Sequence, residues 1–153
     1  MSRIDALLAA EGVPGAAILR EARGLTEEEK NALLGAFDKR DGRTVLLAVL
    51  GGAFAEGVDL AGERLQNVIV VSTGLPQMDA RVRAMRRYHD ENGADGAFLC
   101  MTLPGMVRVI QSAGRLIRTQ SDHGALLLID SRYQRGAERA LLSGTLIGDA
   151  LSG

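Results

Sequence analysis

Short apolar runs separated by amphipathic stretches are the dominant pattern along this chain. Four runs have the length of strands, and they cover residues 16–20, 44–50, 68–72 and 125–130. The runs at 44–50 and 68–72 are continuous, which is typical of parallel strands buried on both faces. Helical periodicity fills the intervals between them. The sequence therefore predicts an α/β fold of three α/β/α layers around a mostly parallel sheet.

Local signals place the helices. Ser2 can cap a helix over residues 3–11, and Thr26–Glu29 forms a capping box in which Glu29 reaches back to the cap amide. Residues 78–92 have helical periodicity and end at Asn92-Gly93, whereas residues 97–103 suit either a strand or a short helix. Further helices are expected from Pro104, which suits a first helical turn, and from about Arg132.

Composition narrows the function classes. The 18 basic and 19 acidic residues leave a net charge of −1, so any contact with nucleic acid or phosphate must come from local patches. Cys100 is the only cysteine, which excludes an internal disulfide and a cysteine-based metal cluster. The chain has no apolar run of membrane-spanning length and no Walker A, H-E-x-x-H or G-x-S-x-G motif. We expect a cytoplasmic protein without a complete active site of its own.

The strongest candidate for chemistry is the segment from Gln111 to Arg118. If it is helical, Gln111, Arg115 and Arg118 lie three and four residues apart on one face, and Gly114 leaves the flank of that face bare. Two guanidinium forks and an amide suit a phosphate. A solvated basic face would have the same spacing.

Two loops at predicted strand ends also carry polar groups. One follows the strand at 44–50 and contains Glu56, Gly57 and Asp59, and the other is Asp130–Arg132. Ligands of parallel sheets bind beyond the carboxyl ends of the strands, so both loops are candidates. A structural turn would explain a glycine-rich loop equally well.

Taken together, these stretches resemble a known family. Phe54–Leu60 with Gly62 resembles motif V of superfamily 2 helicases, and Gln111-x-x-Gly114-Arg115-x-x-Arg118 resembles motif VI. The order of the motifs is similar to that in the second RecA-like domain of the Rad3/XPD/DinG group of DNA helicases. The similarity covers roughly residues 1–145, with 146–153 as a tail. The remaining matching stretches are Gly74–Gln77, Leu103–Met106, Asp122-x-Gly124 and Ile129–Tyr133.

The resemblance implies roles for these residues. Arg115 and Arg118 would be arginine fingers that reach the γ-phosphate of ATP, with Gln111 beside them at the nucleotide. Asp59 would approach the ribose or couple the cleft to DNA, and Glu56 and Gly57 would shape that loop. Gln111, Arg115 and Arg118 follow the Glu56–Asp59 loop and precede Asp130 in the chain, and together they would form one wall of a nucleotide cleft.

The resemblance also implies partners. An N-terminal motor domain, in cis or in trans, would hold most of the ATP and its Mg²⁺, and in this family it commonly carries an iron–sulfur cluster. Single-stranded DNA would be the track. The family's second domain begins with a strand that would precede residues 3–11, so the chain is expected to be a fragment or half of a split protein. A segment exchanged with a second copy could replace that strand and form a homodimer.

The sequence is also compatible with other functions. The chain could be a stand-alone nucleic-acid-binding or interaction module without ATPase activity, or a small phosphate-ester enzyme, although the latter lacks an evident general base. A cluster of arginines in the 78–92 helix could contact single-stranded DNA or form a solvated face. These arginines are Arg81, Arg83, Arg86 and Arg87.

Overall fold

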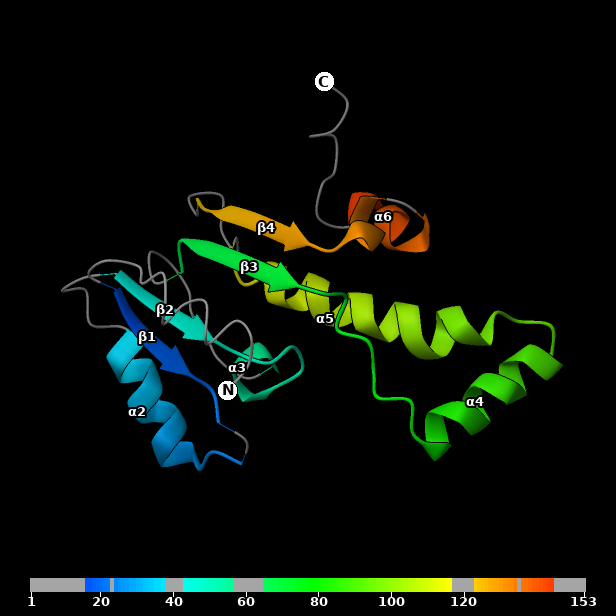
Figure 1. The fold of residues 1–153 in the computed structure, drawn as a ribbon, viewed down its shortest axis with the longest axis horizontal. Helices are drawn as coiled ribbons and strands as arrows, with labels where there is room; N and C mark the ends of the chain where they lie inside the picture. Colours follow the sequence, from blue (N-terminus) through cyan, green and yellow to red (C-terminus); the bar gives the residue numbers. More distant parts are fainter. Residues whose placement is uncertain are drawn as a thin grey trace, which may run out of the picture. The chain divides into compact units, whose positions relative to one another are not determined.

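A computed structural model describes residues 16–22, 24–37, 43–56, 65–116, 123–134 and 136–144. These residues belong to two compact units, residues 1–54 and residues 55–153, and each is described by itself. Figure 1 shows the strands and helices of both units. The helix expected over residues 3–11 and the tail at 146–153 lie outside the described residues.

The first unit is a strand–helix–strand arrangement. Strand β1 (Ala16–Arg20) pairs in parallel with β2 (Arg43–Leu47), and helix α2 (Glu27–Phe37) connects them. The capping box is confirmed, because the Thr26 N–H donates to Glu29 Oε2 at 2.8 Å and the Glu29 N–H donates to Thr26 Oγ1 at 3.2 Å. A loop from β2 leads into the short helix α3 (Ala53–Glu56).

The second unit contains the other parallel pair, β3 (Asn67–Val71) and β4 (Ala125–Ile129). Burial of β3 on both faces, predicted for the run 68–72, is wrong. Ile69 and its register partner Leu127 are 62% and 52% exposed, and Val71 and Ile129 are exposed beside them. Among the described residues each sheet has only two strands. Helix α5 packs against β3, and the side chains on the other face are left open.

The helices of the second unit follow one another closely. Helix α4 (Ala80–Glu91) begins at Asp79, whose carboxylate accepts the Val82 N–H, and ends at Asn92 and Gly93 as predicted. Residues 97–103, ambiguous in the sequence, are helical, with a π-helical turn, η2 (Phe98–Thr102), that runs directly into α5 (Leu103–Ala113). Because Pro104 has no N–H to donate, a widened turn just before it fits the local hydrogen bonding.

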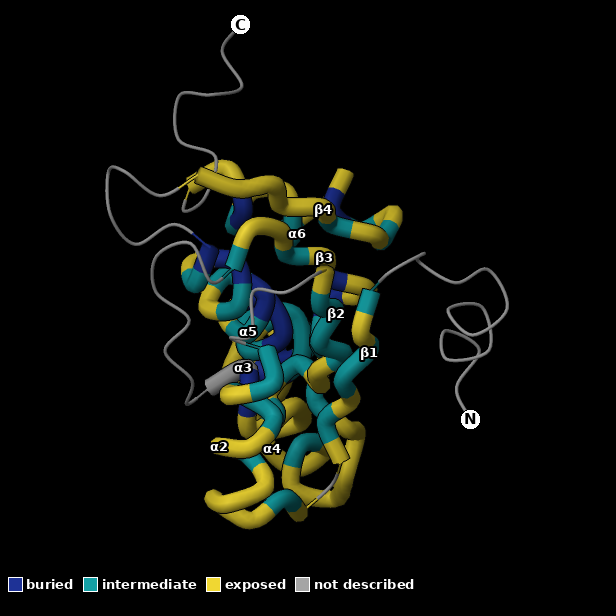
Figure 2. Tube along the Cα trace, turned by 90° about the vertical axis from the view of Figure 1, so that its left-hand side faces the viewer, coloured by how far each residue is buried: buried dark blue, intermediate teal, exposed yellow. Residues whose placement is uncertain are grey.

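The core of the second unit lies along α5. Figure 2 shows buried backbone along α5. Met106 and Val109 are fully buried, and Ala113 and Leu116 are buried as well. After β4 the chain forms a 3₁₀ turn, η3 (Ser131–Gln134), and helix α6 (Gly136–Leu142), close to where a last helix was predicted.

The predicted α/β class with parallel strands is confirmed. No helix within the described ranges is long and apolar enough to cross a membrane.

Candidate functional site

Glu21 clamps the loop that leads to the predicted motif V residues. Its Oε2 accepts the Val49 N–H at 2.8 Å, and its Oε1 accepts the Ala53 N–H at 2.7 Å. A Cβ on Gly52 would lie 2.5 Å from the Glu21 Oε1, so glycine is needed for this approach. The carboxylate therefore caps the start of α3, which ends at Glu56.

Sequence reasoning missed this clamp, because Glu21 is 28 and 32 residues away from the two amides that it binds. The side chain of Glu56 and all of Gly57 and Asp59 lie outside the described residues. The structure therefore places the beginning of the predicted loop but not the groups that were expected to meet a nucleotide.

Replacing Glu21 by glutamine should loosen this loop. An amide has one acceptor oxygen and an NH₂ group, so it can accept only one of the two N–H groups and meets the other with a donor. We expect faster hydrogen exchange at the Val49 or Ala53 amide and a loss of about 1 kcal/mol in unfolding free energy, which NMR-detected exchange and denaturant titration would measure.

Glu28→Gln is the matched control, because Glu28 is an exposed carboxylate of α2 and makes no hydrogen bond within the described ranges. Exchange at the Val49 and Ala53 amides that is the same in both variants would refute the clamp.

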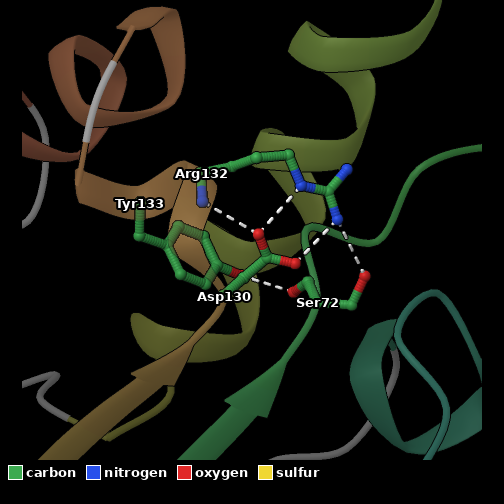
Figure 3. Close-up of polar contacts among 4 residues, drawn as sticks. All are labelled: Ser72, Asp130, Arg132 and Tyr133. Carbon is green, nitrogen blue, oxygen red and sulfur yellow. Dashed lines mark hydrogen bonds and ion pairs between the residues drawn. The ribbon is translucent and has the colours of Figure 1, made fainter.

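A second polar cluster joins the carboxyl ends of β3 and β4 (Figure 3). Asp130 accepts two bonds from the Arg132 guanidinium, at 2.9 Å from Nε and 2.7 Å from Nη2, and a third from the Arg132 N–H at 2.9 Å. Arg132 Nη2 also donates to Ser72 Oγ at 3.3 Å, and the Tyr133 hydroxyl donates to the Ser72 carbonyl. Groups from the ends of both strands thus form one network.

The network has defined protonation states at neutral pH. The hydrogen bonds from Arg132 lower the pKa of Asp130 to about 2, so this carboxylate is ionised. Burial raises the pKa of Tyr133 to about 12, so the phenol keeps the proton that it donates to Ser72. The side chains of Asp130 and Arg132 thus bind each other and form a structural tie between the strand ends. An Asp130 carboxylate held in this way is a poor general base.

The segment held by this tie is strained. Ser72 has a φ of 73°, which is uncommon for a residue other than glycine. Thr73 is completely buried, and its Oγ1 has no hydrogen-bond partner among the described residues. Arg108 Nη1 donates to the Gly74 carbonyl at 3.2 Å from the side of α5. Strain that several contacts hold in place is a common property of functional segments.

The predicted arginine face, which consists of Gln111, Arg115 and Arg118, begins at the end of α5. Gln111 is exposed in the last turn, Gly114 is exposed, and Arg115 is half-buried. No described atom lies within 4 Å of the Cβ position of Gly114 except the carbonyl oxygens of Ile110 and Gln111, so the flank of this turn is open. Arg118 lies outside the described residues.

The helix predicted to carry all of these residues is shorter than expected. Helix α5 ends at Ala113, and the N–H groups of Arg115 and Leu116 donate to Ser112 and Ala113, three residues back. Gly114 favours this ending because glycine stabilises a helix least among non-proline residues. Gln111 and Arg115 are therefore near each other around a tightened turn, not on one continuous helical face.

The residues from Gln111 to Leu116, at the end of α5, are called the arginine turn below. The structure does not bring this turn beside Asp130. The start of α5 lies at the carboxyl end of β3, since a Cβ on Gly105 would be 2.6 Å from the Thr73 carbonyl oxygen. The end of α5 lies at the opposite ends of the strands, where Leu116 and the Gln66 carbonyl surround the Cβ position of Gly124. Because α5 runs antiparallel to β3 and β4 (Figure 1), Arg115 and Asp130 lie at opposite ends of these strands.

Comparisons with known proteins find several relatives of this chain. The model of the helicase C-terminal domain family matches residues 1–146. A regulator of telomere elongation helicase 1 homolog from Anopheles gambiae is 37% identical over 107 residues, which are 65% of this chain and 11% of that protein. A probable ATP-dependent helicase from Methanocaldococcus jannaschii is 33% identical over 125 residues, which are 72% of this chain and 18% of that protein. The chain thus spans less than a fifth of the length of either relative.

Solved structures show the same fold. A structure of an XPD helicase superimposes with a TM-score of 0.66 and 18% identity, over 92% of this chain and 25% of the XPD chain. A structure of apo XPD gives a TM-score of 0.68 with 19% identity, over 92% of this chain and 28% of the other.

Proposed function

This chain belongs to the family of helicase C-terminal domains of the Rad3/XPD/DinG group, and from that premise we propose that it is the second motor domain of an ATP-dependent DNA helicase. The match of the family model over residues 1–146 carries the proposal. In this role the domain closes on a first motor domain around ATP and steps along single-stranded DNA. A cytoplasmic location is part of the proposal.

The arginine turn supplies the catalytic groups in this proposal. Arg115, together with Arg118, acts as an arginine finger on the γ-phosphate, and Gln111 lies beside the nucleotide. A planar guanidinium stabilises the charge that develops on a transferring phosphoryl group. The exposed Gln111 and the open flank of Gly114 support this role, because the phosphate has to arrive from another domain.

The loop around Asp59 is the second contact in the proposal. Asp59 approaches the ribose or links the cleft to DNA, and Glu56 and Gly57 set the course of the backbone. The Glu21 clamp supports this assignment, because it ties the start of α3 to the end of β1. A loop that is held at its base can present its amides in a constant direction.

ATP and its Mg²⁺ are substrates held mainly by the partner domain. The chain contains no G-x-x-x-x-G-K-[ST] sequence that could cradle the phosphates by itself. The described residues include no group of three acidic, histidine or cysteine side chains that could hold a metal ion. The residues present therefore fit a domain that completes a nucleotide site, not one that forms it alone.

We expect the isolated chain to hydrolyse no ATP, with or without single-stranded DNA. Fusion to an N-terminal motor domain, or addition of that domain in trans, should restore DNA-stimulated turnover, which a coupled phosphate-release assay would measure. Clear turnover by the chain alone that disappears in Arg115→Ala would refute the proposal. DNA binding without turnover after the first motor domain is supplied would favour a stand-alone binding module.

A further inference from the structure

Helix α4 has an unusual position in the second unit, because none of its residues is buried. Its apolar side chains are exposed as well, since Met85 is 46% and Tyr88 is 63% exposed. A helix with every face exposed gains little from core packing. Its ends are nevertheless well formed, with Asp79 accepting the Val82 N–H at 2.8 Å and Gly93 at a φ of 77° after the last turn. The caps define the helix and leave its side chains free for other contacts.

One face of α4 carries three arginines. Arg83, Arg86 and Arg87 lie at helical spacings of three and four residues, with Asp90 one turn further along the same face. Together with Met78, these four residues line an open groove of about 400 Å³.

The positive charge of the groove is only partly balanced. Arg83 Nη1 donates to the Met78 carbonyl at 2.8 Å, and Arg86 Nε is 3.7 Å from Asp90 Oδ2. Asp90 is shared, because its Oδ1 also accepts the Gly96 N–H at 2.9 Å.

Arg87 has neither a hydrogen bond nor an ion pair within the described ranges, so three guanidiniums face one carboxylate. Arg83 and Arg87 repel each other at this spacing, and an anion bound between them would relieve that repulsion.

We propose that this groove binds the phosphate backbone of a single-stranded nucleic acid. Guanidinium forks match phosphate oxygens, and the Met78 side chain offers an apolar surface to a sugar or a base. The binding of an anion in this groove is inferred from the geometry of α4. The choice of a nucleic acid over an acidic peptide rests on the proposed function. Binding here needs neither ATP nor the arginine turn.

The test uses the whole 153-residue chain without nucleotide and a fluorescently labelled oligothymidylate. Fluorescence anisotropy over a range of salt concentrations would give the affinity and its salt dependence. Arg87→Ala should weaken binding roughly three- to tenfold and reduce the slope of log K against log salt by about 0.7, the value for one phosphate contact to a single strand.

Arg81→Ala is the matched control, because it removes the same charge from the same exposed helix. Arg81 precedes Arg83 by two residues, which turns it about 200° away from the groove. We expect Arg81→Ala to bind like the unchanged chain, and circular dichroism would verify that both variants keep α4.

Three results would overturn the inference. The first is an equal loss of affinity in both variants, which would indicate a diffuse charge effect, and the second is no measurable binding at low salt. The third is tighter binding of a polyglutamate peptide than of the oligonucleotide, which would identify a peptide groove. Since no outcome depends on ATP hydrolysis, failure here is distinguishable from failure of the motor-domain proposal.

Discussion

Replacing Arg115 by alanine should lower kcat for ATP hydrolysis by about 10³-fold or more in a protein that contains both motor domains, the loss typical of a removed arginine finger. The KM for ATP should change much less, because a finger contributes mainly in the transition state. Steady-state phosphate release at saturating single-stranded DNA would separate the two parameters. Arg115→Lys should recover little, because an ammonium lacks the planar fork.

Arg139→Ala provides the control for this experiment. Arg139 is an exposed arginine of α6 in the same unit, so its removal costs the same charge. Turnover by this variant should match that of the unchanged protein, and thermal unfolding would show whether either variant loses stability. Arg115→Ala protein that is folded and fully active would exclude Arg115 as a catalytic residue.

Gly105→Ala should destabilise the second unit by about 1–3 kcal/mol, the cost of forcing an extra group into a packed contact. The added Cβ would lie 2.6 Å from the Thr73 carbonyl oxygen and 3.3 Å from the Leu75 Cα, both of which are backbone atoms. Neither can move without shifting the strained segment after β3. Denaturant unfolding followed by circular dichroism would measure the change.

Gly35→Ala is the contrasting variant, since it places the same methyl group in a helix where no described atom lies within 4 Å of the Cβ position. Alanine favours a helix over glycine by about 0.5–1 kcal/mol, so this variant should be as stable as the unchanged chain or slightly more stable. A Gly105→Ala chain that unfolds at the same denaturant concentration would show that the two segments separate easily.

Local interactions explain why most elements were predictable. The capping box of α2 involves residues three apart, and the ends of α4 depend on Asp79, Asn92 and Gly93 within one turn. Strand β1 matches its apolar run of five residues. All residues that take part in such local interactions lie within a short stretch of the sequence. Residues 97–103 show one limit, because a short apolar run suits a buried helix as well as a strand. The early end of α5 at Ala113 and the short helix α3 inside a predicted loop were not predicted either.

The family resemblance, and with it the RecA-like fold, was also readable from the order of the motifs. The family resemblance did not determine where the individual site residues lie in space. Gln111, Gly114 and Arg115 lie together at the end of α5, and their roles stay predictions. The remaining candidates lie outside the described residues. These are Arg118, Asp59, Gly57 and the side chain of Glu56.

The amino-acid sequence by itself thus determined most of the elements, the capping box of α2 and the family. Only the tertiary structure decided which distant groups meet: Glu21 with Val49 and Ala53, Arg132 with Ser72 sixty residues away, and Gly105 with the segment after β3. It also decided that α5 runs antiparallel to the strands, which separates Arg115 from Asp130. The physical reason is that hydrogen bonds and steric contacts between distant segments depend on how strands and helices pack, and spacing along the chain does not record that.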